Sequence, residues 1–145
     1  MIRIWQNGRK KKDEYMSVER EKGLEIFADV YGEDAASGLK AYMETDDFGV
    51  ETAVWSNDFS FGTVWAREEL ERKTRSAAVL GMMIALRQSD EIYYHTKMGI
   101  ANGLTKQEIQ EILYSSVVYC GFPASNVAKA AMKKAFKELD TGESR

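Results

Sequence analysis

The chain has 145 residues, of which 44% are hydrophobic and 30% are charged, and this balance is typical of an ordinary globular protein. A chain of this length is most simply one domain over residues 1–145, which can bury roughly 68–70% of its unfolded surface. The net charge of −3 gives no electrostatic reason to expect nucleic acid or an anionic membrane as a partner.

The amino-terminal segment and the cysteine content predict the cellular compartment. A basic run over residues 9–12 is followed at once by two acidic residues, so residues 1–16 are interpreted as a solvated extension. The apolar core of a signal peptide is missing, and the longest apolar run, residues 77–86, is far shorter than the ~20 residues that span a bilayer. The single cysteine, Cys120, cannot form an internal disulfide. The sequence therefore predicts a cytoplasmic protein.

Apolar residues recur at helical spacing along the amino-terminal half of the chain. The first predicted helix follows a cap at Ser17 and ends at Gly32, and a second helix begins two residues later. A third, more aromatic helix covers residues 50–65. The polar Asn57 and Asp58 interrupt its apolar face, which indicates that two faces of this helix are occupied.

The next predicted helix, residues 71–87, is apolar nearly all round between residues 77 and 86. This pattern is typical of a helix buried by neighbours on every side. A small monomer has trouble supplying so many neighbours, and the aromatic helix over residues 50–65 adds further apolar surface. The sequence therefore predicts a homo-oligomer, either a homotrimer or a homohexamer built as a dimer of trimers.

Helix boundaries are sharper in the remaining sequence. Ser89 or Asp90 caps a helix that ends at the Asn-Gly pair 102–103. The segment T-K-Q-E at residues 105–108 is a capping box that begins another helix. The run Gly-Phe-Pro at 121–123 breaks the chain before a last helix. No strand alternation competes with these patterns, so the predicted fold class is all-α.

The only histidine, His95, lies four residues after Glu91 in the stretch S-D-E-I-Y-Y-H. On a helix, residues four apart share a face, with Cβ atoms about 5–6 Å apart. The carboxylate could hold one ring nitrogen and leave the other to exchange a proton, which makes the pair a candidate acid/base unit. The alternative is an ordinary helix-surface pair, because titratable groups of this kind also occur away from active sites.

Four motifs follow one another along the chain: F-G-T-V-W-A-R-E-E-L-E-R-K-T-R-S (61–76), E-I-Y-Y-H (91–95), N-G-L-T-K-Q-E-I-Q-E (102–111) and Y-C-G-F-P-A (119–124). In order and spacing they resemble the carboxymuconolactone decarboxylase family, over roughly residues 19–131. The pattern W-x-R-x-x-L-x-x-K-T-R-S is specific to the decarboxylase branch, whereas the other motifs are shared across the alkyl hydroperoxidase D-like superfamily. The resemblance implies an all-helical, alkyl hydroperoxidase D-like subunit of about six to seven helices that assembles into trimers or hexamers.

The resemblance also implies a reaction. A lyase of this family would convert 4-carboxymuconolactone, or a related lactone acid, to the enol-lactone of β-ketoadipate in protocatechuate catabolism. When CO₂ leaves, electrons can flow through the ring double bond to the lactone carbonyl, and the resulting enolate is protonated on carbon. The protein must supply cations for a dianionic substrate, donors for the oxyanion and a proton source. Because the substrate carries its own electron sink, neither a metal nor an organic cofactor is expected.

The motifs carry the candidate site residues. His95 matches the histidine to which the family assigns proton transfer, and Glu91 would orient the imidazole and raise its pKa. Three arginines are expected to bind the substrate carboxylates, because the guanidinium fork suits a carboxylate: Arg67, Arg72 and Arg75. Trp65 is expected to form a wall of the pocket, and Tyr94 to donate a hydrogen bond to the substrate. At least one of the arginines is expected to form a surface or intersubunit ion pair instead.

Two other functions stay open, namely a peroxidase-like activity of the wider superfamily and a non-catalytic assembly protein that binds a small organic acid. Peroxidase-type relatives carry C-x-x-C with the second cysteine four residues before the histidine, but here those positions are Gln88 and Glu91. Their relay glutamate corresponds to Ser76. Cys120 lies on an apolar stripe and is interpreted as a small buried hydrophobe. The F-S-F-G run at 59–62, where decarboxylases tend to carry Y-A-W-G, leaves the substrate open.

Overall fold

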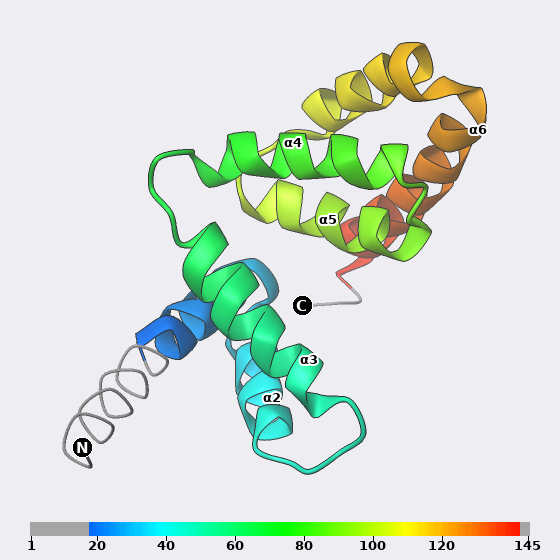
Figure 1. Cartoon of the computed structure of the whole chain (residues 1–145). Coiled ribbons are helices and arrows are strands. Elements are labelled where there is room, and N and C mark those ends of the chain that lie inside the picture. Colours follow the sequence, from blue (N-terminus) through cyan, green and yellow to red (C-terminus); the bar gives the residue numbers. More distant parts are fainter. Residues whose placement is uncertain (1–17, 143–145) are drawn as a thin grey trace, which may run out of the picture. The chain divides into compact units, whose positions relative to one another are not determined.

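The structure is a computed structural model that describes residues 18–142. Within that range every regular element is helical and no strand is present, which confirms the all-α prediction. The chain forms two compact units, one ending at Glu68 and the other beginning at Glu69, and each is described by itself (Figure 1). The expectation of one domain over residues 1–145 stays a prediction. The expected extension over residues 1–16 and the Ser17 cap lie outside the described residues.

The first unit contains a helix over residues 18–31, α2 (Glu33–Met43), α3 (Val50–Trp55) and η1 (Ser56–Trp65). Gly32 ends the first helix as predicted, with a φ of 93° that glycine adopts without steric cost. α3 continues into η1, so the predicted helix over residues 50–65 is present. Its second part differs from the expectation, because η1 is a π-helix in which each turn closes over five residues.

The π-helix η1 packs directly against the helix over residues 18–31 at two glycines. A Cβ atom at Gly23 would lie 2.3 Å from the carbonyl oxygen of Asn57, and a Cβ atom at Gly62 would lie 1.9 Å from the carbonyl oxygen of Glu19. Such separations are far below van der Waals contact, so only glycine permits this backbone approach. The two helices are therefore in backbone contact at both places.

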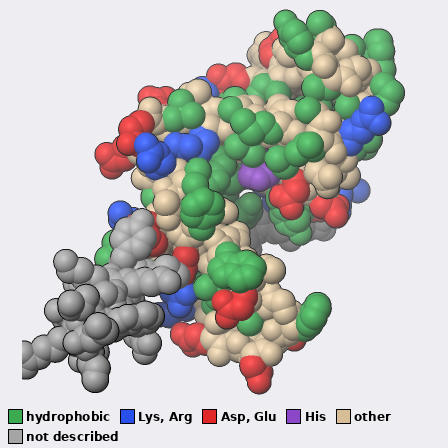
Figure 2. All heavy atoms as spheres, viewed as in Figure 1, with side chains coloured by type: hydrophobic (Ala, Val, Ile, Leu, Met, Phe, Trp, Pro, Cys, Tyr) green, Lys and Arg blue, Asp and Glu red, His purple; other side chains and the backbone are tan. Residues whose placement is uncertain are grey.

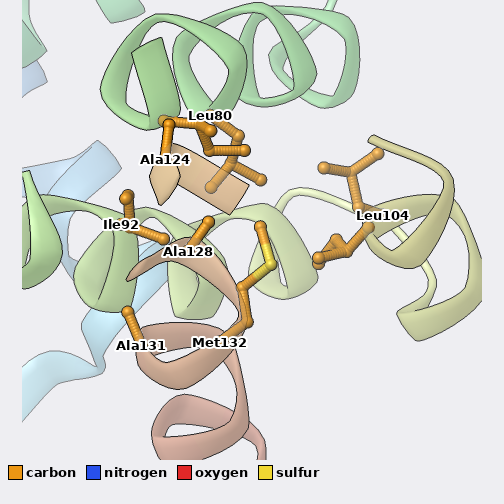
Figure 3. Packing of buried hydrophobic residues seen from close by; sticks show 9 residues of the cluster. Leu80, Ile92, Leu104, Ala124, Ala128, Ala131 and Met132 are labelled. Atoms are coloured by element: carbon orange, nitrogen blue, oxygen red, sulfur yellow. The ribbon is translucent and has the colours of Figure 1, made fainter. Parts of the chain in front are cut away.

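The second unit contains α4 (Arg72–Ala85), α5 (Ser89–Ala101) and α6 (Lys106–Thr141). The predicted break at residues 121–123 is a kink inside α6, where Gly121 has a φ of 83°. The predicted capping box is confirmed, since the Glu108 amide donates to Thr105 Oγ1 at 3.1 Å and the Thr105 amide donates to Glu108 Oε2 at 2.8 Å. The core joins all three helices (Figure 3) and consists of Leu80, Ile84, Ile92, Leu104, Ile109, Ala124, Ala128, Ala131 and Met132.

Helix α4 corrects one expectation, because within a single chain it is not buried on every side. Its buried side chains are Ser76, Leu80 and Ile84, which share one face. On the other side Met82 is 57% exposed, and Leu86, just after the helix, is 62% exposed. The sequence pattern shows which faces of a helix are apolar. It does not show whether the residues that cover those faces belong to the same chain.

Candidate active site

Helix α5 carries the candidate acid/base pair. His95 Nε2 lies 3.8 Å from Glu91 Oε2, and the two side chains are 19% and 56% exposed, respectively. This separation is too long for a hydrogen bond. Glu91 therefore acts on the imidazole through its charge, and the expected hydrogen bond that would orient the ring is absent between these two atoms.

Burial dominates the electrostatics of His95. Removal of the imidazolium from water lowers the pKa of His95 below its ordinary value of 6.5, and the nearby Glu91 carboxylate raises it by a smaller amount. The predicted effect of Glu91 is therefore present, but it does not set the net direction of the pKa shift. The Glu91 contribution has the predicted sign, but the sequence did not reveal the burial that outweighs it.

The lowered pKa of His95 predicts a pH-dependent stability. The unfolded chain binds a proton at this site more readily than the folded chain, so the stabilisation is fully present above pH 6.5 and falls as the pH drops below that value. Glu108 and Glu138 have pKa values lowered from 4.5, so their contribution begins to fall only under that pH. Urea unfolding between pH 4.5 and 6.5 should show a smaller pH slope for His95→Gln than for the parent, and an equal slope would contradict this.

A second polar cluster fixes α5 from the side opposite His95. The Tyr93 hydroxyl donates to Glu138 Oε2, and Lys97 Nζ lies 3.3 Å from the same carboxylate oxygen. Hydrogen bonding by the Tyr93 hydroxyl is the main reason that the pKa of Glu138 is lowered. Sequence reasoning missed this cluster. The four-residue spacing of Tyr93 and Lys97 was visible, but the partner on α6 is more than 40 positions away.

The arginines of α4 are placed by the register of the α4–α5 pair. Asn102 Nδ2 donates to Ser76 Oγ at 3.1 Å, so the start of α4 lies beside the end of α5. His95 precedes Asn102 by seven residues, which is about 10 Å along a helix. Arg72, one turn before Ser76, therefore lies toward the end of the pair that is remote from His95, and Arg75 adjoins Ser76.

The remaining candidate residues are divided between the units. Tyr94 lies on α5 next to His95, is half exposed, and packs its ring edge-on against Tyr93 at a centroid distance of 5.0 Å. Trp65 and Arg67 belong to the first unit, where Trp65 is buried and Arg67 is exposed. The structure thus brings His95, Glu91 and Tyr94 together on α5, and the binding roles of the others stay predictions. Figure 2 shows the histidine at the surface with apolar and acidic side chains around it.

The described residues were searched for metal sites and for membrane-spanning helices. Residues 18–142 contain no group of three or more histidine, cysteine, aspartate or glutamate side chains placed to hold a metal ion. Over the same residues, none of the helices combines the length and the apolar character needed to cross a membrane.

Comparison with known proteins decides the family. The sequence model of the carboxymuconolactone decarboxylase family matches residues 51–134, which is more than half of the chain and includes η1, α4 and α5. The chain belongs to the carboxymuconolactone decarboxylase family. It is 33% identical over 118 residues to the 4-carboxymuconolactone decarboxylase of Acinetobacter baylyi, covering 81% of this chain and 87% of that protein.

A second relative shows that substrates vary among similar chains. The nitrosuccinic acid decarboxylase of Metarhizium robertsii is 32% identical over 124 residues, which cover 85% of each chain. Both relatives are decarboxylases, and the chain described here is a decarboxylase of this family. The resemblance inferred from the sequence motifs is therefore confirmed.

Proposed function

We propose that the chain decarboxylates 4-carboxymuconolactone, or a related lactone acid, to β-ketoadipate enol-lactone in protocatechuate catabolism, without a cofactor and with His95 as the acid/base group. The observation that carries this proposal is a half-buried histidine on α5, beside a carboxylate, in a chain similar to a 4-carboxymuconolactone decarboxylase. Burial that lowers the pKa of a histidine makes its imidazolium a stronger acid, which suits proton transfer to carbon.

The proposed step conserves atoms and charge within the substrate and one imidazolium. The bond from the ring carbon to the departing carboxylate breaks, and its electron pair moves through the ring double bond to the lactone carbonyl oxygen. The His95 imidazolium then gives its proton to the carbon next to that carbonyl, and the neutral imidazole regains a proton from water. A bound dianion would raise the pKa of His95. The protonated acid would therefore be favoured once the substrate is in place.

The second candidate substrate is nitrosuccinic acid, favoured by the relative from Metarhizium robertsii. A nitro group on the carbon that carries the departing carboxylate is also an electron sink, so the same proton transfer to carbon completes the reaction. The test measures CO₂ release from both acids by the purified chain and compares their kcat/KM values. We expect the lactone to be preferred. If the nitro acid is preferred, nitrosuccinic acid takes the place of the lactone as the proposed substrate. If neither acid releases CO₂, the proposal is contradicted.

Substitution of Cys120 tests this proposal against a peroxidase-like activity. Its side chain is half-buried and packs against the core of the second unit, close to the kink of α6. Replacement by alanine or serine should leave CO₂ release largely intact, with a modest loss of stability from the missing sulfur contacts. Peroxide consumption coupled to a dithiol should be absent in the parent chain. Robust turnover that depends on Cys120 would favour the redox activity instead.

We also propose that the chain acts as a homotrimer or a homohexamer in the cytoplasm. Support comes from apolar side chains that a single chain leaves exposed: Met82 and Leu86 at α4, and Tyr114, Val118, Tyr119 and Phe122 along α6. Such patches mark interaction surfaces more often than free surface. Light scattering at micromolar concentration should give three or six times the chain mass of 16.4 kDa. A monodisperse species of a single chain would contradict this proposal.

A further inference from the structure

The first unit holds a polar cluster that the proposed chemistry does not use, in which Asn57 and Asp58 are buried and Arg20 is partly exposed. Arg20 forms a two-pronged ion pair with Asp58, in which Nε donates to Oδ1 at 3.1 Å and Nη2 donates to Oδ2 at 2.7 Å. Asn57 is fully buried, and its Nδ2 donates to the Arg20 carbonyl oxygen and to Asp58 Oδ1, each at 3.0 Å. The cluster therefore ties the first turn of η1 to the helix over residues 18–31.

The contacts of η1 require π winding. The Thr63 hydroxyl donates to the carbonyl oxygen of Asp58 at 3.0 Å, and the Ala66 amide donates to the carbonyl oxygen of Phe61 at 3.0 Å, in each case five residues earlier. In an α-helix, residues five apart point about 140° away from each other. In a π-helix they lie on nearly the same side, because the hydrogen bonds close over five residues.

The same spacing separates the two points where η1 meets its neighbour. Asn57 contacts the helix over residues 18–31 at Gly23, and Gly62 contacts it at Glu19. Only π winding brings positions 57 and 62 to one face, so both contacts can form together only in this geometry. π-Helices usually extend over a single turn and are frequent at functional sites. The length of η1, ten residues, therefore needs a stabilising partner such as this helix.

We propose that the helix over residues 18–31 is a template that holds residues 56–65 in the π form, and that Arg20 and Asp58 are positioning residues for Trp65. Trp65 is the last residue of η1, seven residues after Asp58, and its side chain is 7% exposed. Because π and α winding differ at every residue, the difference in direction accumulates along η1. Relaxation to an α-helix would turn Trp65 away from its present direction.

The template can be tested by fluorescence, independently of activity. In a background of Trp5→Phe and Trp55→Phe, Trp65 is the only remaining tryptophan. Asp58→Asn keeps the shape of the side chain but removes the charge that holds the Arg20 fork. We expect the emission of Trp65 to shift to longer wavelength and its quenching by acrylamide to increase, with the helical circular dichroism retained.

Matched variants separate this effect from general destabilisation. Glu51→Gln removes another carboxylate whose charge acts on Arg20. Glu51 takes no part in the hydrogen bonds among Arg20, Asn57 and Asp58, so this variant should leave Trp65 emission unchanged. Thr63→Val removes the hydroxyl bond to the Asp58 carbonyl oxygen, together with the longer contact of 3.5 Å to Glu19 Oε2. It should shift the emission in the same direction by less, whereas Thr63→Ser should restore the parental emission. If Asp58→Asn does not fold, the comparison of Thr63→Val with Thr63→Ser tests the template instead. Parental emission and quenching in folded Asp58→Asn or Thr63→Val would overturn the template.

The positioning role rests on the proposed function and on the prediction from the sequence that Trp65 contacts the substrate. Asp58→Asn should then raise KM for 4-carboxymuconolactone about tenfold with a smaller change in kcat, because His95 is unaltered. A shifted emission with parental KM would overturn the positioning role. Absence of decarboxylation in the parent chain would remove the proposed function, and the fluorescence result would still decide the template.

Discussion

Replacement of His95 by alanine or glutamine should lower kcat for decarboxylation by about 10²–10⁴, the usual scale for loss of a general acid or base. His95 is partly exposed on α5 and does not belong to the core cluster of the second unit, so the variants should stay folded and keep the parental oligomer size. KM should change less than kcat, because the imidazole acts on the developing carbanion. The measurement is the initial rate of CO₂ release.

The pH dependence of the parent enzyme should identify the same group. If the imidazolium is the acid, kcat/KM falls as the pH rises through the pKa of free His95, which lies below 6.5. The corresponding limb of kcat should lie at higher pH, because a bound dianion raises that pKa. Glu91→Gln removes a charge that raises the pKa of His95, so this limb should move to lower pH.

Circular dichroism and light scattering are the controls for both variants. The Glu91→Gln shift should be small, because Glu91 is more than half exposed and solvent screens its charge. A folded His95→Ala oligomer with parental kcat would show that this histidine is structural. The assignment of the acid/base pair would then be wrong, and another group would have to supply the proton.

Replacement of Gly62 by alanine should be the most destabilising single change in the first unit. The added Cβ would lie 1.9 Å from the Glu19 carbonyl oxygen, and a backbone atom cannot move aside as the end of a flexible side chain can. The crossing of the two helices must therefore open, at a cost of about 3 kcal/mol or more in the free energy of unfolding. Denaturant unfolding monitored by circular dichroism measures this loss.

Gly38 supplies the matched control. It lies inside α2, and a Cβ atom at this position would meet nothing within 4 Å. Gly38→Ala should therefore stabilise the chain by about 0.5–1 kcal/mol, because alanine loses less backbone freedom in a helix. Equal effects of the two substitutions would show that the close approach at Gly62 does not hold the helices together.

Much of the fold could be predicted from the sequence because its signals are local. The Thr105–Glu108 capping box and the breaks at Gly32 and Gly121 each depend on a few neighbouring residues, and all are present in the structure. The π form of η1 could not be predicted in this way. It depends on Gly23 and Arg20, which lie more than 30 positions before the residues that they contact.

The candidate site was less predictable than the fold, for the same reason. The spacing of Glu91 and His95 correctly placed both side chains on one helix, but the net pKa shift of His95 depends on burial by distant residues. Arg72 shares a motif with Arg75, yet sequence proximity says nothing about distance from His95. The register set by Ser76 and Asn102 supplies that information.

The central claim is that this chain decarboxylates a carboxylated lactone without a cofactor. The most direct test incubates chelator-treated enzyme with 4-carboxymuconolactone and measures CO₂ together with the lactone product by nuclear magnetic resonance. We predict one CO₂ and one enol-lactone per substrate consumed, with no increase in rate when metal ions or organic coenzymes are added. No release of CO₂ above the uncatalysed rate, or release that requires an added metal or coenzyme, would contradict the claim.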